Sequence, residues 1–139
     1  MIAYVYDDGG RPAAGFRGEA GDCVTRAIAI ATGKRYADVY ADLQSYERST
    51  RAPKGHKSVR DGTRRVVYER YLARLGWTWT PTMSIGSGCR VHLRADELPS
   101  GRIIARLSRH MVAVLDGVSH DTHDPSRDGT RCVYGYFSR

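Results

Sequence analysis

Asparagine is absent from this sequence, and glutamine occurs once, at Gln44. Lysine is also scarce: only 3 of the 22 basic residues are lysines, so arginine supplies nearly all of the positive charge. This bias is typical of a GC-rich genome, and part of the arginine excess reflects codon usage. The formal net charge of +7 nevertheless favours encounters with acidic proteins or nucleic acid, although it does not name a partner.

Long hydrophobic runs are missing as well. The longest, such as residues 27–31, fall far short of the roughly 20 apolar residues that cross a bilayer. Residues 1–12 carry acidic residues and glycines and lack the basic and apolar regions of a secretory signal. We therefore expect a cytoplasmic protein that makes no contact with a membrane.

Cysteine occurs three times, at Cys23, Cys89 and Cys132, and no two cysteines lie close in sequence. An odd number of cysteines without an export signal predicts free thiols rather than disulfides, and the spacing does not suit structural zinc. Residues 120–124 offer four metal-binding side chains, but adjacent strand residues point to opposite faces, so few could converge on one ion. We expect neither a metal nor a cofactor.

The remaining composition is that of a folded protein. Hydrophobic residues make up 41% and charged residues 27% of the chain, which excludes disorder as the default interpretation. A chain of 139 residues is long enough for one hydrophobic core and too short for two domains. We therefore expect a single domain that spans residues 1–139.

Three helices are predicted in the first half of the chain. Asp22 is a typical N-cap residue, and apolar residues at positions 24, 27, 28 and 31 form one helical face before Gly33 ends the helix. Similar patterns predict helices over residues 36–46 and 63–75. The polar, basic residues 47–62 between them are expected to form a long surface loop.

The second half of the chain indicates strands. The hydrophobic period changes to two after Gly76, and strands are expected over residues 77–79, 102–107, 110–115, 118–121 and 132–137, with a short edge strand near the N-terminus. Asp116-Gly117 predicts a tight hairpin turn. Helices followed by an antiparallel sheet define an α+β fold.

Cys23 is the candidate nucleophile. It lies in the first turn of the predicted helix, where free N–H groups and the helix dipole favour thiolate over thiol. The same N–H groups could bind the oxyanion that forms when a thiolate attacks an amide carbonyl. Burial in the core is the alternative interpretation, and for Cys89 and Cys132 it is the favoured one.

The candidate base is His110, which opens a predicted strand. If Asp116-Gly117 is a two-residue turn, Leu115 pairs with Val118, and Asp121 then lies on the same face as His110 and within reach of its ring. A carboxylate there would orient the imidazole. Asp124 is the second candidate for this role.

The order of the three candidate residues resembles that of the papain-like cysteine peptidases: a cysteine at the start of a helix, a histidine at the start of a later strand and an aspartate on the next strand. The matching stretches are residues 21–24 and 110–114 with Asp121, and the compact bacterial C39-like peptidases are the most similar group. The resemblance implies a papain-like α+β fold in which Cys23 is the nucleophile, His110 the general base and acid, and Asp121 the orienting residue. The family usually places glutamine about six residues before the nucleophile as an oxyanion donor, and this chain has Arg17 there.

These observations predict a cysteine hydrolase that cleaves a peptide, isopeptide or related amide bond in a peptide or protein substrate, which the basic charge suggests is acidic. Arg17 and Asp22 are assigned to oxyanion or substrate binding. Two alternatives stay open: acyl transfer to an amine, as in transglutaminases, and a non-enzymatic basic module that binds an acidic protein or nucleic acid, in part through the basic residues at 51–65. The small size and arginine bias suit a phage or bacterial accessory protein.

Overall fold

A computed structural model describes residues 2–12, 15, 22–50 and 62–139. Within these ranges the chain forms three α-helices and a six-stranded mixed sheet, which confirms the α+β class. The predicted basic loop at 51–65 lies largely outside the described residues. No helix in the described part of the chain is long and apolar enough to cross a membrane.

The helices begin and end close to where the sequence places them. Helix α1 spans Cys23–Thr32, and Gly33 ends it in the left-handed conformation with φ 77°, where its N–H donates to the Ala29 carbonyl. Helix α2 spans Tyr36–Ser49, three residues beyond the predicted end, and helix α3 spans Arg65–Arg74. The extension removes residues 47–49 from the predicted surface loop.

The sheet has the strand order β1-β5-β4-β3-β6-β2. Strands β3, β4 and β5 have the predicted bounds, and Leu115 pairs with Val118 as the hairpin turn requires. The six strands are Ala3–Tyr6 (β1), Thr78–Pro81 (β2), Arg102–Leu107 (β3), His110–Leu115 (β4), Val118–Asp121 (β5) and Gly135–Ser138 (β6), and a short 3-10 helix, η2, spans Ala95–Glu97.

The expectation of a purely antiparallel sheet is wrong at one edge. Strand β1 pairs with β5 in parallel, with Ala3 beside Val118 and Tyr6 beside Asp121, so the sheet is mixed. Two parallel strands need a crossover between them. Here most of the chain separates the two strands, and no local sequence signal specifies their pairing.

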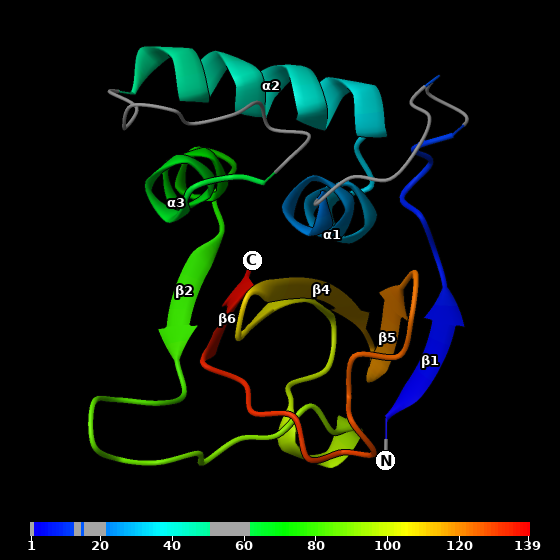
Figure 1. Ribbon diagram of the computed structural model, residues 1–139, viewed down its shortest axis with the longest axis vertical. Coiled ribbons are helices and arrows are strands. Elements are labelled where there is room, and N and C mark those ends of the chain that lie inside the picture. Colours follow the sequence, from blue (N-terminus) through cyan, green and yellow to red (C-terminus); the bar gives the residue numbers. More distant parts are fainter. Residues whose placement is uncertain (1, 13–14, 16–21, 51–61) are drawn as a thin grey trace.

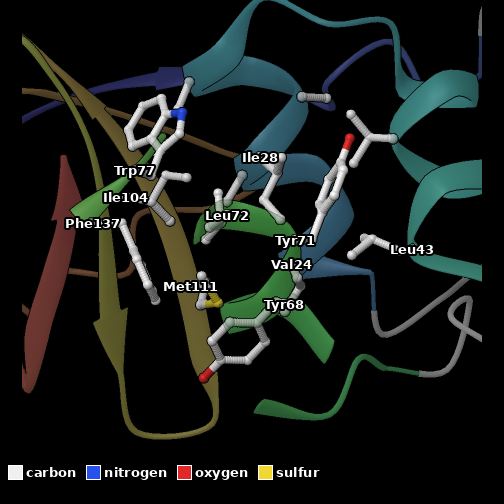
Figure 2. Packing of buried hydrophobic residues seen from close by; sticks show 14 of the residues in the cluster. Val24, Ile28, Leu43, Tyr68, Tyr71, Leu72, Trp77, Ile104, Met111 and Phe137 are labelled. Carbon is white, nitrogen blue, oxygen red and sulfur yellow. The ribbon is translucent and has the colours of Figure 1, made fainter. Parts of the chain in front are cut away.

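Both faces of this sheet are buried, and each contributes apolar side chains to a hydrophobic cluster. The helices cover one face, and α1 contacts β3, β4 and β5 from beneath α2 (Figure 1). The core between the helices and the sheet includes Ile28, Leu72, Ile104, Met111 and Phe137 (Figure 2). On the other face, alternate residues of the same strands pack with the segment around Leu93. Helix α1 is therefore held rigidly across the centre of the sheet.

The prediction of three free thiols is wrong for two of them. Cys89 and Cys132 form a disulfide across a sequence separation of 43 residues, with their Cα atoms 5.8 Å apart. An isolated β-bridge between His92 and Cys132 brings the segment before η2 against the segment before β6. Sequence spacing could not reveal this contact because the two cysteines lie on separate loops. Cys23 is the one free cysteine.

Candidate active site

Three elements bring the predicted catalytic residues together at one end of the sheet. Cys23 is the first residue of α1, His110 the first of β4 and Asp121 the last of β5. The neighbouring antiparallel strands place the start of β4 beside the end of β5. A two-residue turn, with Arg109 at φ 55°, connects β3 to His110 and fixes its position.

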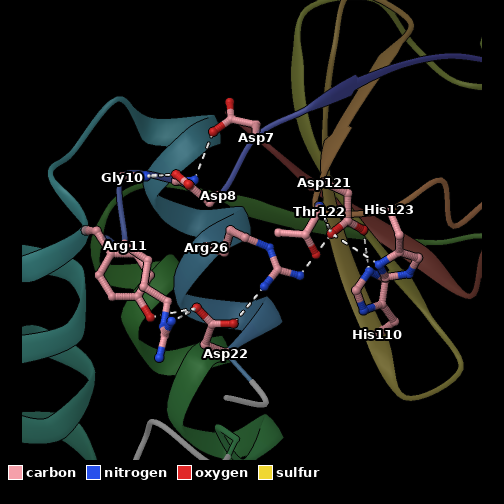
Figure 3. A network of polar contacts seen from close by, with 12 residues as sticks. Asp7, Asp8, Gly10, Arg11, Asp22, Arg26, His110, Asp121, Thr122 and His123 are labelled. Carbon is pink, nitrogen blue, oxygen red and sulfur yellow. Dashed lines mark hydrogen bonds and ion pairs between the residues drawn. The ribbon is translucent and has the colours of Figure 1, made fainter. Parts of the chain in front are cut away.

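The His110 ring contacts the aspartate that the hairpin register predicts. Its Nε2 lies 2.5 Å from Asp121 Oδ2 (Figure 3), and the side chains are 12% and 1% exposed. Asp124, the second candidate, is exposed and accepts a hydrogen bond from the Ser126 N–H at 3.0 Å instead. Asp121 is therefore the carboxylate that orients this imidazole.

Cys23 lines the same cleft as His110, and its interaction with the ring is one of the causes that raise the pKa of His110. Because Nε2 faces Asp121, Nδ1 is the ring nitrogen that remains for the thiol. Burial by itself lowers the pKa of His110, but the hydrogen bond to Asp121, the interaction with Cys23 and the Asp121 charge raise this pKa to about 9. At neutral pH the ring is thus an imidazolium, which stabilises a neighbouring thiolate.

The Asp121 carboxylate is fully engaged within the protein. Burial raises its pKa, but the hydrogen bond from His110 and the Thr122 N–H at 2.7 Å, together with the Arg26 charge, bring the pKa below its usual value. Arg26 donates from a terminal guanidinium nitrogen to Asp121 Oδ1 at 2.9 Å. Asp121 therefore stays ionised and opposite His110 across the neutral pH range.

Arg26 links the helix of the nucleophile to this carboxylate, and the sequence analysis missed it. The other terminal nitrogen of its guanidinium donates to Asp22 Oδ1 at 2.6 Å, and the Tyr36 hydroxyl donates to Asp22 Oδ2 at 2.7 Å (Figure 3). The buried guanidinium thus bridges two buried carboxylates. The available signal was the i, i+4 spacing of Asp22 and Arg26 within an otherwise apolar helix.

The same network changes the role of Asp22. It occupies the N-cap position, but its side chain makes no capping hydrogen bond, so the prediction that it caps the first turn is wrong. Its two oxygens are bound by Arg26 and Tyr36 instead. The backbone N–H groups of the first turn, where Cys23 lies, thus lack a side-chain cap. The assignment of Asp22 to substrate or oxyanion binding stays a prediction.

A cleft of about 280 Å³ opens beside Cys23 and His110. Its other walls come from α3 and from the end of β3 and the turn that follows, with lining residues that include Arg65, Tyr68 and Arg109. A larger cavity of about 460 Å³ lies at the opposite end of α1, near Thr32 and Arg102. The described residues that line that cavity include no cysteine and no histidine, so the smaller cleft is the candidate active site.

His123 adds a third group to this cluster. Its Nδ1 lies 3.9 Å from Asp121 Oδ1, and its ring centroid is 5.1 Å from that of His110. Ligand atoms of the two histidines and Asp121 lie within 4.8 Å of one another, a spacing that a metal ion could use. The Arg26 guanidinium already neutralises this carboxylate, however, and a neighbouring cation disfavours a second one. The group therefore suits proton transfer better than metal binding.

Arg17, the predicted oxyanion donor, lies outside the described residues, and its role stays a prediction. Comparisons of the chain with family models, curated proteins and solved structures find no match.

Proposed function

We propose that this protein is a cysteine hydrolase that cleaves a peptide, isopeptide or related amide bond through Cys23, His110 and Asp121. The observation that carries the proposal is that the one free cysteine lines the same cleft as a half-buried histidine, whose ring is held by a buried carboxylate. A structural cysteine has no need of such an arrangement, whereas a nucleophile does.

In the first half of the reaction, the Cys23 sulfur attacks the amide carbonyl carbon and forms a C–S bond. The oxyanion accepts hydrogen bonds from the uncapped N–H groups at the start of α1. As the C–N bond breaks, His110 donates its proton to the leaving amine, and a thioester remains on Cys23. Asp121 holds the ring in place through Nε2 while the proton leaves from the other nitrogen.

In the second half, neutral His110 removes a proton from water, and the water oxygen attacks the thioester carbon. Release of the carboxylic acid restores the thiolate and the imidazolium. An amine in place of water would give acyl transfer through the same residues.

The papain-like form of the α+β fold is part of this proposal. It is supported by a nucleophile that begins a helix packed across the sheet and by a base and a carboxylate on neighbouring strands. The cytoplasmic location stays a prediction from the sequence. The Cys89–Cys132 disulfide argues against it, because disulfides persist mainly in oxidising compartments.

The proposal predicts that purified wild-type protein cleaves members of a proteome-derived peptide library, detected as new termini by mass spectrometry. Cys23→Ala should show no cleavage while its circular dichroism spectrum and unfolding midpoint stay close to those of the wild type. Cleavage that persists in Cys23→Ala, or a wild type that cleaves nothing at any concentration, contradicts the proposal. Salt-sensitive peptide binding without cleavage would favour the alternative of a basic binding module.

A further inference from the structure

Among the described residues, three arginines and no acidic residue line the cleft beside Cys23. Arg65 projects from α3, Arg106 from β3 and Arg109 from the turn before His110. Glu69 neutralises Arg65 one helical turn along α3. Arg106 and Arg109 form no ion pair with any carboxylate in the described part of the chain. Two positive charges that have no carboxylate partner among the described residues thus flank the proposed reaction centre.

A second hollow, of about 330 Å³, continues from this cleft. The two hollows share Arg65 and Arg106 as lining residues, so they meet at these two side chains. The far part of the second hollow is mostly apolar, with lining residues Trp79, Pro81, Met83, Ile85 and Tyr134. Ile85 is fully exposed and adds to this contiguous apolar surface.

Arg106 occupies the junction between the cationic and apolar parts. Its guanidinium lies 5.8 Å from the centroid of the Tyr134 ring, and its side chain is half-buried. Stacking on a ring limits the motion of the guanidinium, and its planar fork matches the two oxygens of a carboxylate. The geometry is that of a carboxylate subsite.

We propose that this groove binds an extended acidic peptide segment, with an aspartate or glutamate side chain on Arg106 and an apolar side chain in the hollow around Met83 and Ile85. This inference rests on the proposed function, since it names the substrate class of the same site. An extended strand rises about 3.3 Å per residue and points residues i and i+2 to the same face, so an acidic and an apolar residue two positions apart suit the two neighbouring subsites. A nucleic-acid strand fits less well, because the aromatic rings of this hollow already have partners. The Trp79 ring packs on Phe137 with the centroids 4.8 Å apart, and Arg106 lies over the Tyr134 ring.

The test is peptide binding to the Cys23→Ala variant, measured by fluorescence anisotropy, so that its result does not depend on turnover. The probe is a fluorescent ten-residue peptide with a central glutamate–alanine–leucine sequence, and its matched control carries glutamine–alanine–leucine. We expect the glutamate peptide to bind at least about tenfold more tightly, the loss that follows when one charge-assisted hydrogen bond is removed.

Adding the Arg106→Gln substitution to Cys23→Ala should abolish the difference in affinity between the two peptides. Arg74→Gln removes the same charge from an exposed site that lines neither hollow and should leave the difference intact. Three results would each overturn the inference. The first is an equal effect of the two arginine variants, and the second is no binding of the glutamate peptide at millimolar concentration. The third is Arg106-dependent binding of a twelve-nucleotide single-stranded DNA in preference to the peptide. Binding without cleavage by the wild type would contradict only the proposed function.

Discussion

Replacement of Arg26 by methionine is expected to lower the free energy of unfolding by about 3 to 5 kcal/mol. The Arg26 guanidinium lies between the carboxylates of Asp22 and Asp121, and all three side chains are buried. Methionine fills a similar volume but removes the cation that lies between the two buried carboxylates, so among the described residues Asp22 keeps only Arg11, at 3.6 Å, and Asp121 keeps only His110 as a close cationic partner. Uncompensated buried charge is among the most destabilising changes in a protein interior. Urea unfolding of both proteins at pH 7 measures the difference.

The matched control is Arg35→Met, which also removes an arginine from an ion pair. Arg35 pairs with Asp38 at 2.9 Å, but its side chain is 83% exposed, and such surface pairs contribute at most about 1 kcal/mol. A loss below about 1 kcal/mol for Arg26→Met, or equal losses for the two variants, would show that the buried network does not organise this end of α1.

Stability should also fall between pH 6.5 and about 9 because of His110. Its pKa is about 9 in the folded protein, above the value of 6.5 for a free histidine. A histidine whose pKa is higher in the folded than in the unfolded protein stabilises the fold. This contribution is complete at pH values below the pKa of the unfolded state, and it disappears as pH rises through the pKa of the folded state. At 1.36 kcal/mol per pKa unit, the contribution reaches about 3 kcal/mol.

His110→Gln isolates this contribution from other titrations, because groups such as His123 are present in both proteins. The difference in unfolding free energy between wild type and His110→Gln should be largest at pH 6 and should shrink by about 3 kcal/mol at pH 9.5. A difference that stays constant over this range would mean that His110 is not held as an imidazolium by its buried partners.

The local parts of the fold could be predicted from the sequence. The Asp116-Gly117 turn fixes the register of β4 and β5, and Gly33 marks the end of α1, because each signal acts within a few residues. The parallel pairing of β1 with β5 and the disulfide between Cys89 and Cys132 could not be predicted. Both contacts join segments that lie far apart in sequence, and no local sequence pattern in either segment identifies the other.

One part of the candidate site could likewise be predicted from the sequence, and another part could not. The contact between His110 and Asp121 follows from strand register, so alternation along two strands was enough to predict it. The role of Arg26 was hidden, because its two partners lie on different elements and a charged residue on a helix is usually assigned to the surface. The arginines around the cleft come from a helix, a strand and a turn, so only the folded chain gathers them.

The most direct test of the Cys23–His110 pair is the rate of Cys23 alkylation by iodoacetamide as a function of pH, in wild type and in His110→Ala. Without reductant, the disulfide protects Cys89 and Cys132 from alkylation, so the measured rate is that of Cys23 alone. The pair predicts rapid alkylation of the wild type at pH 6, well below the free-thiol pKa of about 8.5, and at least about a tenfold loss in His110→Ala. A wild-type rate that follows that of a free thiol, or one indifferent to His110→Ala in a folded protein, would contradict the account.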